Sequence, residues 1–396
     1  MKHRPAVKTA LTSLCLLLLL ATLGCDIEVG NWARATHERT VALDVPLPPG
    51  SAVDVDTQLG SVTVSGADVT DCNIVAEIVA RAPTEEEARQ LAKQIRITAE
   101  SSRDTLKIRA DKPRATQNRS ISVSYTVTVP RQTSVVCRSA YGPLEIARLS
   151  GSVTGKTSSG PIDVGHIEGT VDVSTSYGSV ACKNVAGPTV KLRSSSGSIT
   201  ATNVRAELQA ETAYGPVTCA KIAADELRLK SSSGDISISS ADFRTCDAHT
   251  SYGTVRVDGL EGDSIKLHSG SGSVDLLTSA AGTVDLSTSY GQIRVDNVTT
   301  AQLTAKSSSG NVDVVCSDTT AADLNANVKT GYGSIRFTPP PAFAGAVYLA
   351  TSYGSVRADR PITVSGELTK KKINGKIGDG PGTLRLETGS GSIVLK

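Results

Sequence analysis

A short tyrosine–glycine motif returns along most of this chain at a nearly constant interval. One copy reads T-S-Y-G-S-V from Thr175 to Val180, and copies with serine in place of tyrosine, such as S-S-G-S-I at Ser195, alternate with it. From Gly142 to Gly310 the glycines of successive copies are 18 or 19 residues apart. Self-similarity at a fixed short period is typical of repeat architectures, so this motif constrains the fold more than any other feature.

Each repeat unit contains two short apolar alternations and no helical pattern. Around Gly197, Val190 and Leu192 alternate with charged residues before the glycine, and Ile199 and Ala201 alternate with polar residues after it. Such alternation is typical of half-buried strands. We therefore predict an all-β fold, a β-solenoid of 18–19-residue coils with two short strands per coil. The coils would stack about 4.8 Å apart over a narrow core.

Two other folds also use short alternating strands. Two repeat units together have about the length of a β-propeller blade, and the propeller is the alternative fold. The two halves of such a blade would be unusually alike, which favours the solenoid. A membrane β-barrel would need aromatic girdles, whereas only 3% of the residues are aromatic.

The first residues have the features of an export signal. Basic residues precede an apolar run at 11–20, which is too short to predict a membrane span. The run ends in A-T-L-G-C at Cys25, which resembles the cleavage site of bacterial lipoproteins. We expect residues 1–24 to be a lipoprotein-type signal peptide, Cys25 to be lipidated and residues 25–37 to be a tether. Ordinary secretion is the alternative.

Residues 38–131 lack the regular repeat and are expected to form a small N-terminal α/β cap of strands plus one helix. Thr84 followed by Glu87 is the signature of a helix N-terminus, and an apolar stripe follows it. We predict a helix near 84–98 in a cap that covers the first open edge of the solenoid, residues 132–396. The last strand, 392–395, has no evident cap and is expected to be an exposed edge.

The order of these features resembles the bacterial putative-adhesin domain family of unknown function. A helix, a hairpin ending in T-V-P-R at 128–131, the S-Y-G and S-S-G coils, and T-G-S-G-S-I at 388–393 follow one another over residues 38–396. The resemblance implies an exported, often membrane-attached β-solenoid. The family has no established catalytic residues, so the resemblance implies none here.

Composition and residue spacing do not indicate an enzyme. The five histidines lack the spacing of a zinc site, and no nucleophile elbow is present, so we expect no metal, cofactor or catalytic residue. The formal net charge of +2 does not favour nucleic acid as a partner. The third residue after each glycine alternates in sign from Arg256 to Arg336, which we interpret as a device that fixes strand register.

The cysteines beyond the signal segment are expected to belong mainly to the core. Cys182 and Cys219 share an inward position two coils apart, and this separation of about 9.6 Å exceeds the reach of a disulfide. Cys137 and Cys246 also fall on inward positions, and we predict that all four pack as small core residues. A disulfide between Cys72 and Cys137 stays open as an alternative.

The tyrosines of the motif are the candidate binding residues. The alternation of inward and outward residues along the strands favours an inward position for these tyrosines. Each ring would then fill one corner of the core beside a small serine. The alternative is an exposed aromatic ladder with a disaccharide-like spacing that stacks on an extended glycan. The aligned tyrosines are Tyr141, Tyr177, Tyr214, Tyr252 and Tyr290.

From these features we predict a non-enzymatic, lipid-anchored cell-envelope protein, periplasmic or surface-exposed, with adhesin-like binding of an envelope or extracellular polymer or protein. The expected partners are the membrane, through the N-terminal lipid, and a glycan or envelope protein; the sequence does not indicate the oligomeric state. The alternative is a structural or envelope-stress-sensing module that docks a partner on its C-terminal strand edge by strand addition.

Overall fold

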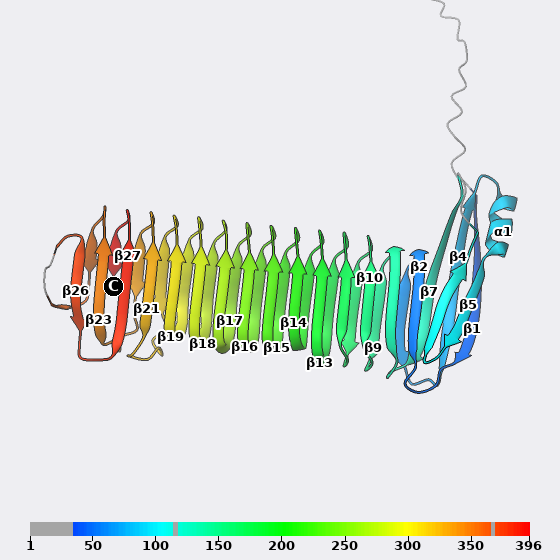
Figure 1. The fold of residues 1–396 in the computed structure, drawn as a ribbon, viewed down its shortest axis with the longest axis horizontal. Helices are drawn as coiled ribbons and strands as arrows, with labels where there is room; N and C mark the ends of the chain where they lie inside the picture. Colours follow the sequence, from blue (N-terminus) through cyan, green and yellow to red (C-terminus); the bar gives the residue numbers. More distant parts are fainter. Residues whose placement is uncertain (1–34, 114–117, 366–368) are drawn as a thin grey trace, which may run out of the picture.

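The chain forms a long rod of stacked β coils with a small cap at its N-terminal end (Figure 1). The computed structural model describes residues 35–113, 118–365 and 369–396. Successive coils pair in parallel along the rod rather than around a central axis, which confirms the predicted solenoid and excludes the propeller. The predicted signal peptide and Cys25 lie outside the described residues.

The cap combines two antiparallel sheets with the one helix of the described chain. The Thr84 hydroxyl accepts a hydrogen bond of 3.3 Å from the Glu87 N–H and so caps the helix, as the sequence predicted. At the other end of the helix, the Arg39 guanidinium donates to the carbonyl oxygens of Ala92 and Ile95. The cap elements are β1 (Ala35–Pro46), β4 (Asp71–Ala82), α1 (Glu85–Gln94), β5 (Arg96–Ser102), β6 (Thr105–Asp111) and β7 (Ser120–Pro130).

The first coil of the solenoid precedes most of the cap in the sequence. It consists of β2 (Ala52–Leu59) and β3 (Val62–Ala67), which pair in parallel with β8 (Ser134–Tyr141) and β9 (Leu144–Leu149). On their other side, β2 and β3 pair in parallel with the cap strands β6 and β7. The cap is therefore an insertion between the first and second coils, and it covers the outer edge of the first.

In the middle of the rod the two strands of neighbouring repeats merge into longer elements. The strand after one glycine continues around the far corner of the coil and becomes the strand before the next glycine. The merged elements are β13 (Val180–Ser194), β14 (Ile199–Thr212), β15 (Val217–Ser231), β16 (Ile236–Thr250), β17 (Val255–Ser269), β18 (Val274–Thr288) and β19 (Ile293–Ser307). They are flanked by the separate short strands β10 (Val153–Thr157), β11 (Ile162–Ile167), β12 (Val171–Thr175) and β20 (Val312–Cys316).

In the nine coils from Gly142 to Gly291, the far corner turns through a residue in the left-handed conformation, six positions after the glycine. Asparagine, which tolerates a positive φ better than most residues, occupies this position in three coils. The Asn203 amide donates a hydrogen bond of 2.7 Å to the Asn184 side chain and so links neighbouring corners. The residues of this column are Arg148, His166, Asn184, Asn203, Lys221, Ser240, Gly259, Thr278 and Asn297.

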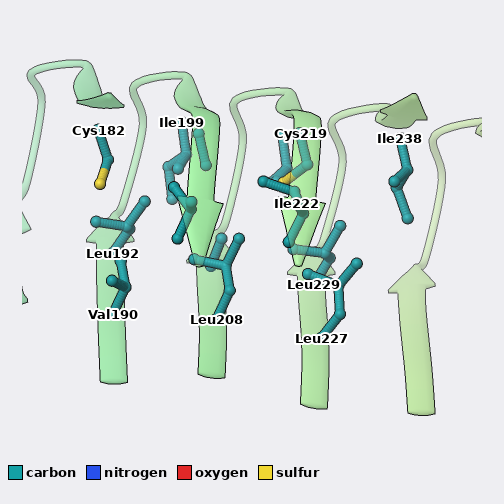
Figure 2. Packing of buried hydrophobic residues seen from close by; sticks show 14 of the residues in the cluster. Cys182, Val190, Leu192, Ile199, Leu208, Cys219, Ile222, Leu227, Leu229 and Ile238 are labelled. Carbon is teal, nitrogen blue, oxygen red and sulfur yellow. The ribbon is translucent and has the colours of Figure 1, made fainter. Parts of the chain in front are cut away.

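The core is a single narrow stack of aliphatic side chains between the two strand layers (Figure 2). The inward cysteines lie in this stack, as predicted; Cys219, for example, is fully buried beside Ile222 and Leu229. All six cysteines of the described chain are buried and free, Cys72 and Cys137 included. The cysteines therefore contribute to packing as small apolar residues.

The end of the chain inserts between two earlier coils. β27 pairs in parallel with β21 and with β23, and β28 pairs with β22 and with β24. The expectation of an exposed edge at 392–395 is therefore wrong, because the chain turns back at β26 and fills the space between two coils. The elements of this end are β21 (Asn325–Thr330), β22 (Ile335–Thr338), β23 (Gly345–Thr351), β24 (Val356–Ala358), β25 (Thr363–Val364), β26 (Lys372–Ile377), β27 (Gly382–Thr388) and β28 (Ile393–Leu395).

Candidate binding ladder at the glycine corner

The glycines of the repeat stack on one another along one corner of the rod. A Cβ atom on Gly178 would overlap the carbonyl oxygen of Gly160 in the preceding coil, and the same relationship holds for each neighbouring pair from Gly60 onwards. Only glycine allows the backbones of two successive turns to approach this closely. The close approach therefore explains why the motif keeps its glycine in every coil.

A buried hydroxyl three residues before each glycine joins the stacked turns. The Thr175 hydroxyl accepts a hydrogen bond of 3.1 Å from the Gly178 N–H and donates one of 3.0 Å to the Gly160 carbonyl. Ser194 makes the same two bonds to Gly197 and Gly178. The signal for this column, a Thr or Ser three residues before each glycine, was present in the sequence and was not recognised. The column contains Ser139, Thr157, Thr175, Ser194, Thr212, Ser231, Thr250, Ser269, Thr288, Ser307, Thr330, Thr388 and Thr351.

The tyrosines lie on the outside of this corner, so the prediction of inward rings is wrong. Tyr177 is 72% exposed and Tyr214 is 69% exposed. The reason is that the inward position at the corner belongs to the threonine or serine hydroxyl two residues earlier, and the tight glycine turn then projects the tyrosine outward. The exposed tyrosines are Tyr141, Tyr177, Tyr214, Tyr252, Tyr290, Tyr332 and Tyr353, with exposures of 61% to 81%.

The alternation of tyrosine and serine continues through the inserted C-terminal coil. Tyr332 and Tyr353 belong to consecutive Y-G copies in the sequence, but the turn that carries Ser390 lies between them. The Ser390 N–H donates to the Gly331 carbonyl at 3.0 Å, and the Tyr353 N–H donates to the Gly389 carbonyl at 2.9 Å. The insertion therefore extends one regular ladder to seven tyrosines, two more than the sequence analysis aligned.

The tyrosine rings do not stabilise one another. Tyrosines in alternate coils are separated by two strand spacings, about 9.6 Å, and no two of their rings stack within the described part of the chain. Each ring therefore presents its face to solvent without a packing partner from the ladder. A row of such rings offers flat apolar faces and polar hydroxyls to a ligand.

Shallow hollows run along the strand layer that leads into the tyrosine turns. One, of about 430 Å³, is lined by Lys156, Arg193, Lys230 and the acidic Glu211, and by serines of the turns. A second, of about 520 Å³, is lined by Lys306, Lys329 and Tyr332, among others. These hollows give the ladder a polar flank on this side, in which basic side chains outnumber acidic ones.

The column of alternating charge lies on the opposite strand layer. Arg256 approaches Asp275 at 4.0 Å and Arg336 approaches Asp313 at 3.7 Å across neighbouring strands, as predicted for a device that fixes register. Arg294 instead binds Asp296 of its own strand at 2.9 Å. Such exposed pairs each contribute at most about 1 kcal/mol.

Burial determines the acid–base properties of the described thiols and of one pair of histidines. Burial raises the pKa of the Cys219 thiol to about 12, which keeps it protonated and unreactive at neutral pH. His249 and His268 stack with ring centroids 4.6 Å apart, and burial, with a smaller contribution from His268, lowers the pKa of His249.

Within the described ranges, no group of three or more His, Cys, Asp or Glu side chains is placed to hold a metal ion. No helix in these ranges is long and apolar enough to cross a membrane.

Fold and corner together define a capped β-solenoid with one aromatic edge. The Toastrack DUF4097 family model matches residues 51–217 and 213–396, so the chain belongs to this family. This confirms the resemblance to a domain family of unknown function.

Two solved structures that match this chain come from bacteria. A putative adhesin from Parabacteroides distasonis is 11% identical, with 92% of this chain and 98% of that one covered and a TM-score of 0.27. A putative adhesin from Bacteroides fragilis is 14% identical, with 90% and 97% covered and a TM-score of 0.23. With TM-scores this low, the similarities do not bear on function. No curated protein matches the chain.

Proposed function

We propose that this protein is a non-enzymatic, adhesin-like rod that binds an extended glycan along its tyrosine ladder. The observation that carries the proposal is the unbroken alternation of exposed tyrosine and small serine along one corner, including the coil that the C-terminus inserts between Tyr332 and Tyr353. A chain that needed only a packed solenoid would have no reason to keep this alternation where the sequence order is interrupted.

The geometry fits a sugar polymer better than a compact ligand. Tyrosine presents a flat apolar face together with a polar hydroxyl, which suits the mixed apolar and hydroxylated surface of a sugar ring. The ring spacing of about 9.6 Å is close to the disaccharide repeat of an extended β-linked polysaccharide. Several weak contacts in register would add up to useful avidity without a deep pocket.

The proposed location is the bacterial cell envelope. Cleavage before Cys25 would leave a lipidated cysteine that anchors the protein to a membrane, with the residues between Cys25 and β1 as the tether to the cap. In this arrangement the rod projects the ladder away from the membrane, toward an envelope or extracellular polymer. Docking of a partner on strand 392–395 is not proposed, because β28 is paired on both sides.

The proposal is tested by converting two tyrosine coils into serine coils. The double variant Tyr214→Ser and Tyr252→Ser should lose most retention of the protein on β-linked polysaccharides and purified cell-wall glycans. Its melting temperature should hardly change, because both rings are 69% exposed. Ser233→Ala, in the coil between them, is the matched control and should bind normally. Unchanged retention of the double variant, or a large loss of stability with no glycan bound by the parent protein, would contradict the proposal.

A further inference from the structure

A second column of side chains runs beside the ladder, four residues before each glycine. The strand register aligns these residues in every coil, for example Lys156 with Ser174, Ser174 with Arg193, and Glu211 with Lys230. The side chains of this column point outward and lie on the strand layer that carries the hollows beside the tyrosine turns. The column is thus the nearest set of charged groups on that side of the ladder.

The cations of this column follow the serine coils. From the coil of Gly160 to that of Gly310, four of the five serine coils carry Lys or Arg at this position and the fifth carries His268, whereas the tyrosine coils carry Ser, Glu, His and Ser. The cations of the serine coils are Lys156, Arg193, Lys230 and Lys306. Over this central stretch the cations therefore fall in serine coils, with neighbouring serine coils about 9.6 Å apart, whereas nearer the two ends Arg138 and Lys329 stand in tyrosine coils and Glu387 in a serine coil.

Among the described residues, two of these four cations carry no ion pair that would compete with a ligand. Lys156 and Lys306 are exposed and form no ion pair within the described part of the chain. Lys230 is 62% exposed and lies 3.6 Å from Glu211, a loose contact, whereas Arg193 pairs with Asp172 at 2.8 Å. On the opposite strand layer, by contrast, basic and acidic residues alternate and offset one another. The two sides of the ladder therefore differ in charge.

We propose that the ligand is an acidic polysaccharide with one carboxylate in each disaccharide. This inference rests on the proposed function. One sugar of the disaccharide stacks on a tyrosine, and the carboxylate of the other reaches the cation of the adjoining serine coil. A neutral glycan would leave the column of cations unused. A polymer with a charge on every sugar would bring half of its carboxylates to tyrosine coils, where Glu211 would repel one of them.

The test compares hyaluronan, which has one carboxylate per disaccharide, with its neutral carboxyl-reduced derivative of the same length. The protein should bind hyaluronan more tightly than the neutral derivative, and only the hyaluronan affinity should fall as salt is raised. The triple variant Lys156→Gln, Lys230→Gln and Lys306→Gln should lose about tenfold in affinity for hyaluronan. Its affinity for the neutral derivative should stay the same.

A control variant separates a specific column from general attraction between opposite charges. Lys183→Gln, Arg256→Gln and Arg336→Gln remove the same charge from the opposite strand layer and should bind hyaluronan like the parent protein. Equal losses in the two triple variants would overturn the proposal. Equal binding of hyaluronan and its neutral derivative, still dependent on Tyr214 and Tyr252, would also overturn it and leave the proposed function standing.

Two further outcomes bear on the nature of the polymer. If neither glycan binds, the proposed function fails and this inference fails with it. Aromatic rings and cations also suit single-stranded nucleic acid, so an oligothymidine of similar charge serves as a competitor. Tighter binding of the oligothymidine than of hyaluronan would overturn the proposal, whereas failure to displace hyaluronan would support it.

Discussion

Gly391 stacks directly on Gly333, although an entire coil and a hairpin separate them in the sequence. A Cβ atom on Gly391 would overlap the carbonyl oxygen of Gly333, the same relationship that neighbouring coils show elsewhere in the rod. The last two strands thus form an internal coil, the earlier strands β23 and β24 lie on its outer side, and β26 pairs with the outer edge of β23 (Figure 1). This order makes the C-terminus part of the core and keeps the ladder regular.

Removal of the last coil should disrupt the end of the solenoid. A chain that stops at Pro381 loses Leu386, Ile393 and Leu395, all fully buried, and each buried aliphatic side chain is worth about 1.5–3 kcal/mol. β23 and β24 would then lose β27 and β28, the strands with which they pair on the inner side. We expect limited proteolysis to cut between 339 and 381 in the shortened chain and not in the parent. Protection of that segment in the shortened chain would show that the inserted coil is dispensable.

The hydrogen bonds of the buried hydroxyls should stabilise the fold beyond the packing of the side chains that carry them. Thr250→Val keeps the side-chain shape but leaves the Gly253 N–H and the Gly234 carbonyl without their partner. We expect a loss of about 1–3 kcal/mol in the free energy of unfolding, measured by chemical denaturation. Thr250→Ser keeps both hydrogen bonds and should cost less than the valine variant. A valine variant as stable as the parent would contradict a role for the hydroxyl column.

The glycine column should not tolerate even a methyl group. Gly178→Ala places a Cβ against the Gly160 carbonyl, which neither backbone can avoid, and should lower the free energy of unfolding by at least about 3 kcal/mol. Gly165→Ala is the matched control, because its Cβ would meet only the Lys183 carbonyl oxygen, at 3.6 Å. That variant should unfold like the parent. Equal effects of the two substitutions in thermal unfolding would show that crowding is not the reason for the glycines.

The buried thiols should make the fold sensitive to alkali. Burial raises the pKa of the thiols of Cys137, Cys182 and Cys219 from 9.0 to about 12. The folded state therefore holds the thiol protons more tightly than the unfolded state. The contribution of the buried thiols to stability is complete below the unfolded pKa and is lost as the pH rises toward the folded pKa. The free energy of unfolding should therefore fall between about pH 9 and about pH 12, by up to about 1.4 kcal/mol per pH unit for each thiol. Cys219→Ala should show a smaller decline in alkaline denaturation, and an unchanged decline would exclude the thiols as its cause.

Much of the fold could be predicted from the period of the repeat, because glycine spacing and apolar alternation are local properties. The spatial order of the last coils could not be predicted from the repeat. It depends on long-range pairing, that is, on which strand edges are still unpaired when the chain turns back. The helix N-cap at Thr84 was also predictable, since capping involves residues only three positions apart. The place of the first coil, ahead of the inserted cap, depends on long-range pairing of β2 with β8.

The site was predicted only in part, for a physical reason. Along a strand, side chains alternate between inward and outward, and this alternation predicts an inward Tyr177. The alternation does not continue through the glycine turn, and the Tyr177 ring is 72% exposed. The hydroxyl of Thr175 fills the corner instead. The alternation of tyrosine with serine was visible in the sequence, and its continuation through Ser390 required the structure.

The most direct test of the ladder is the affinity of the protein for β-linked acidic oligosaccharides of increasing length. If sugars stack on successive tyrosines, the affinity should rise with each added disaccharide, because each brings one more ring into contact. The double serine variant lacks Tyr214 and Tyr252 in the middle of the ladder. Its affinity should therefore stop rising at a shorter oligosaccharide than that of the parent protein. An affinity that stops rising after a single disaccharide would contradict the ladder and indicate one local site.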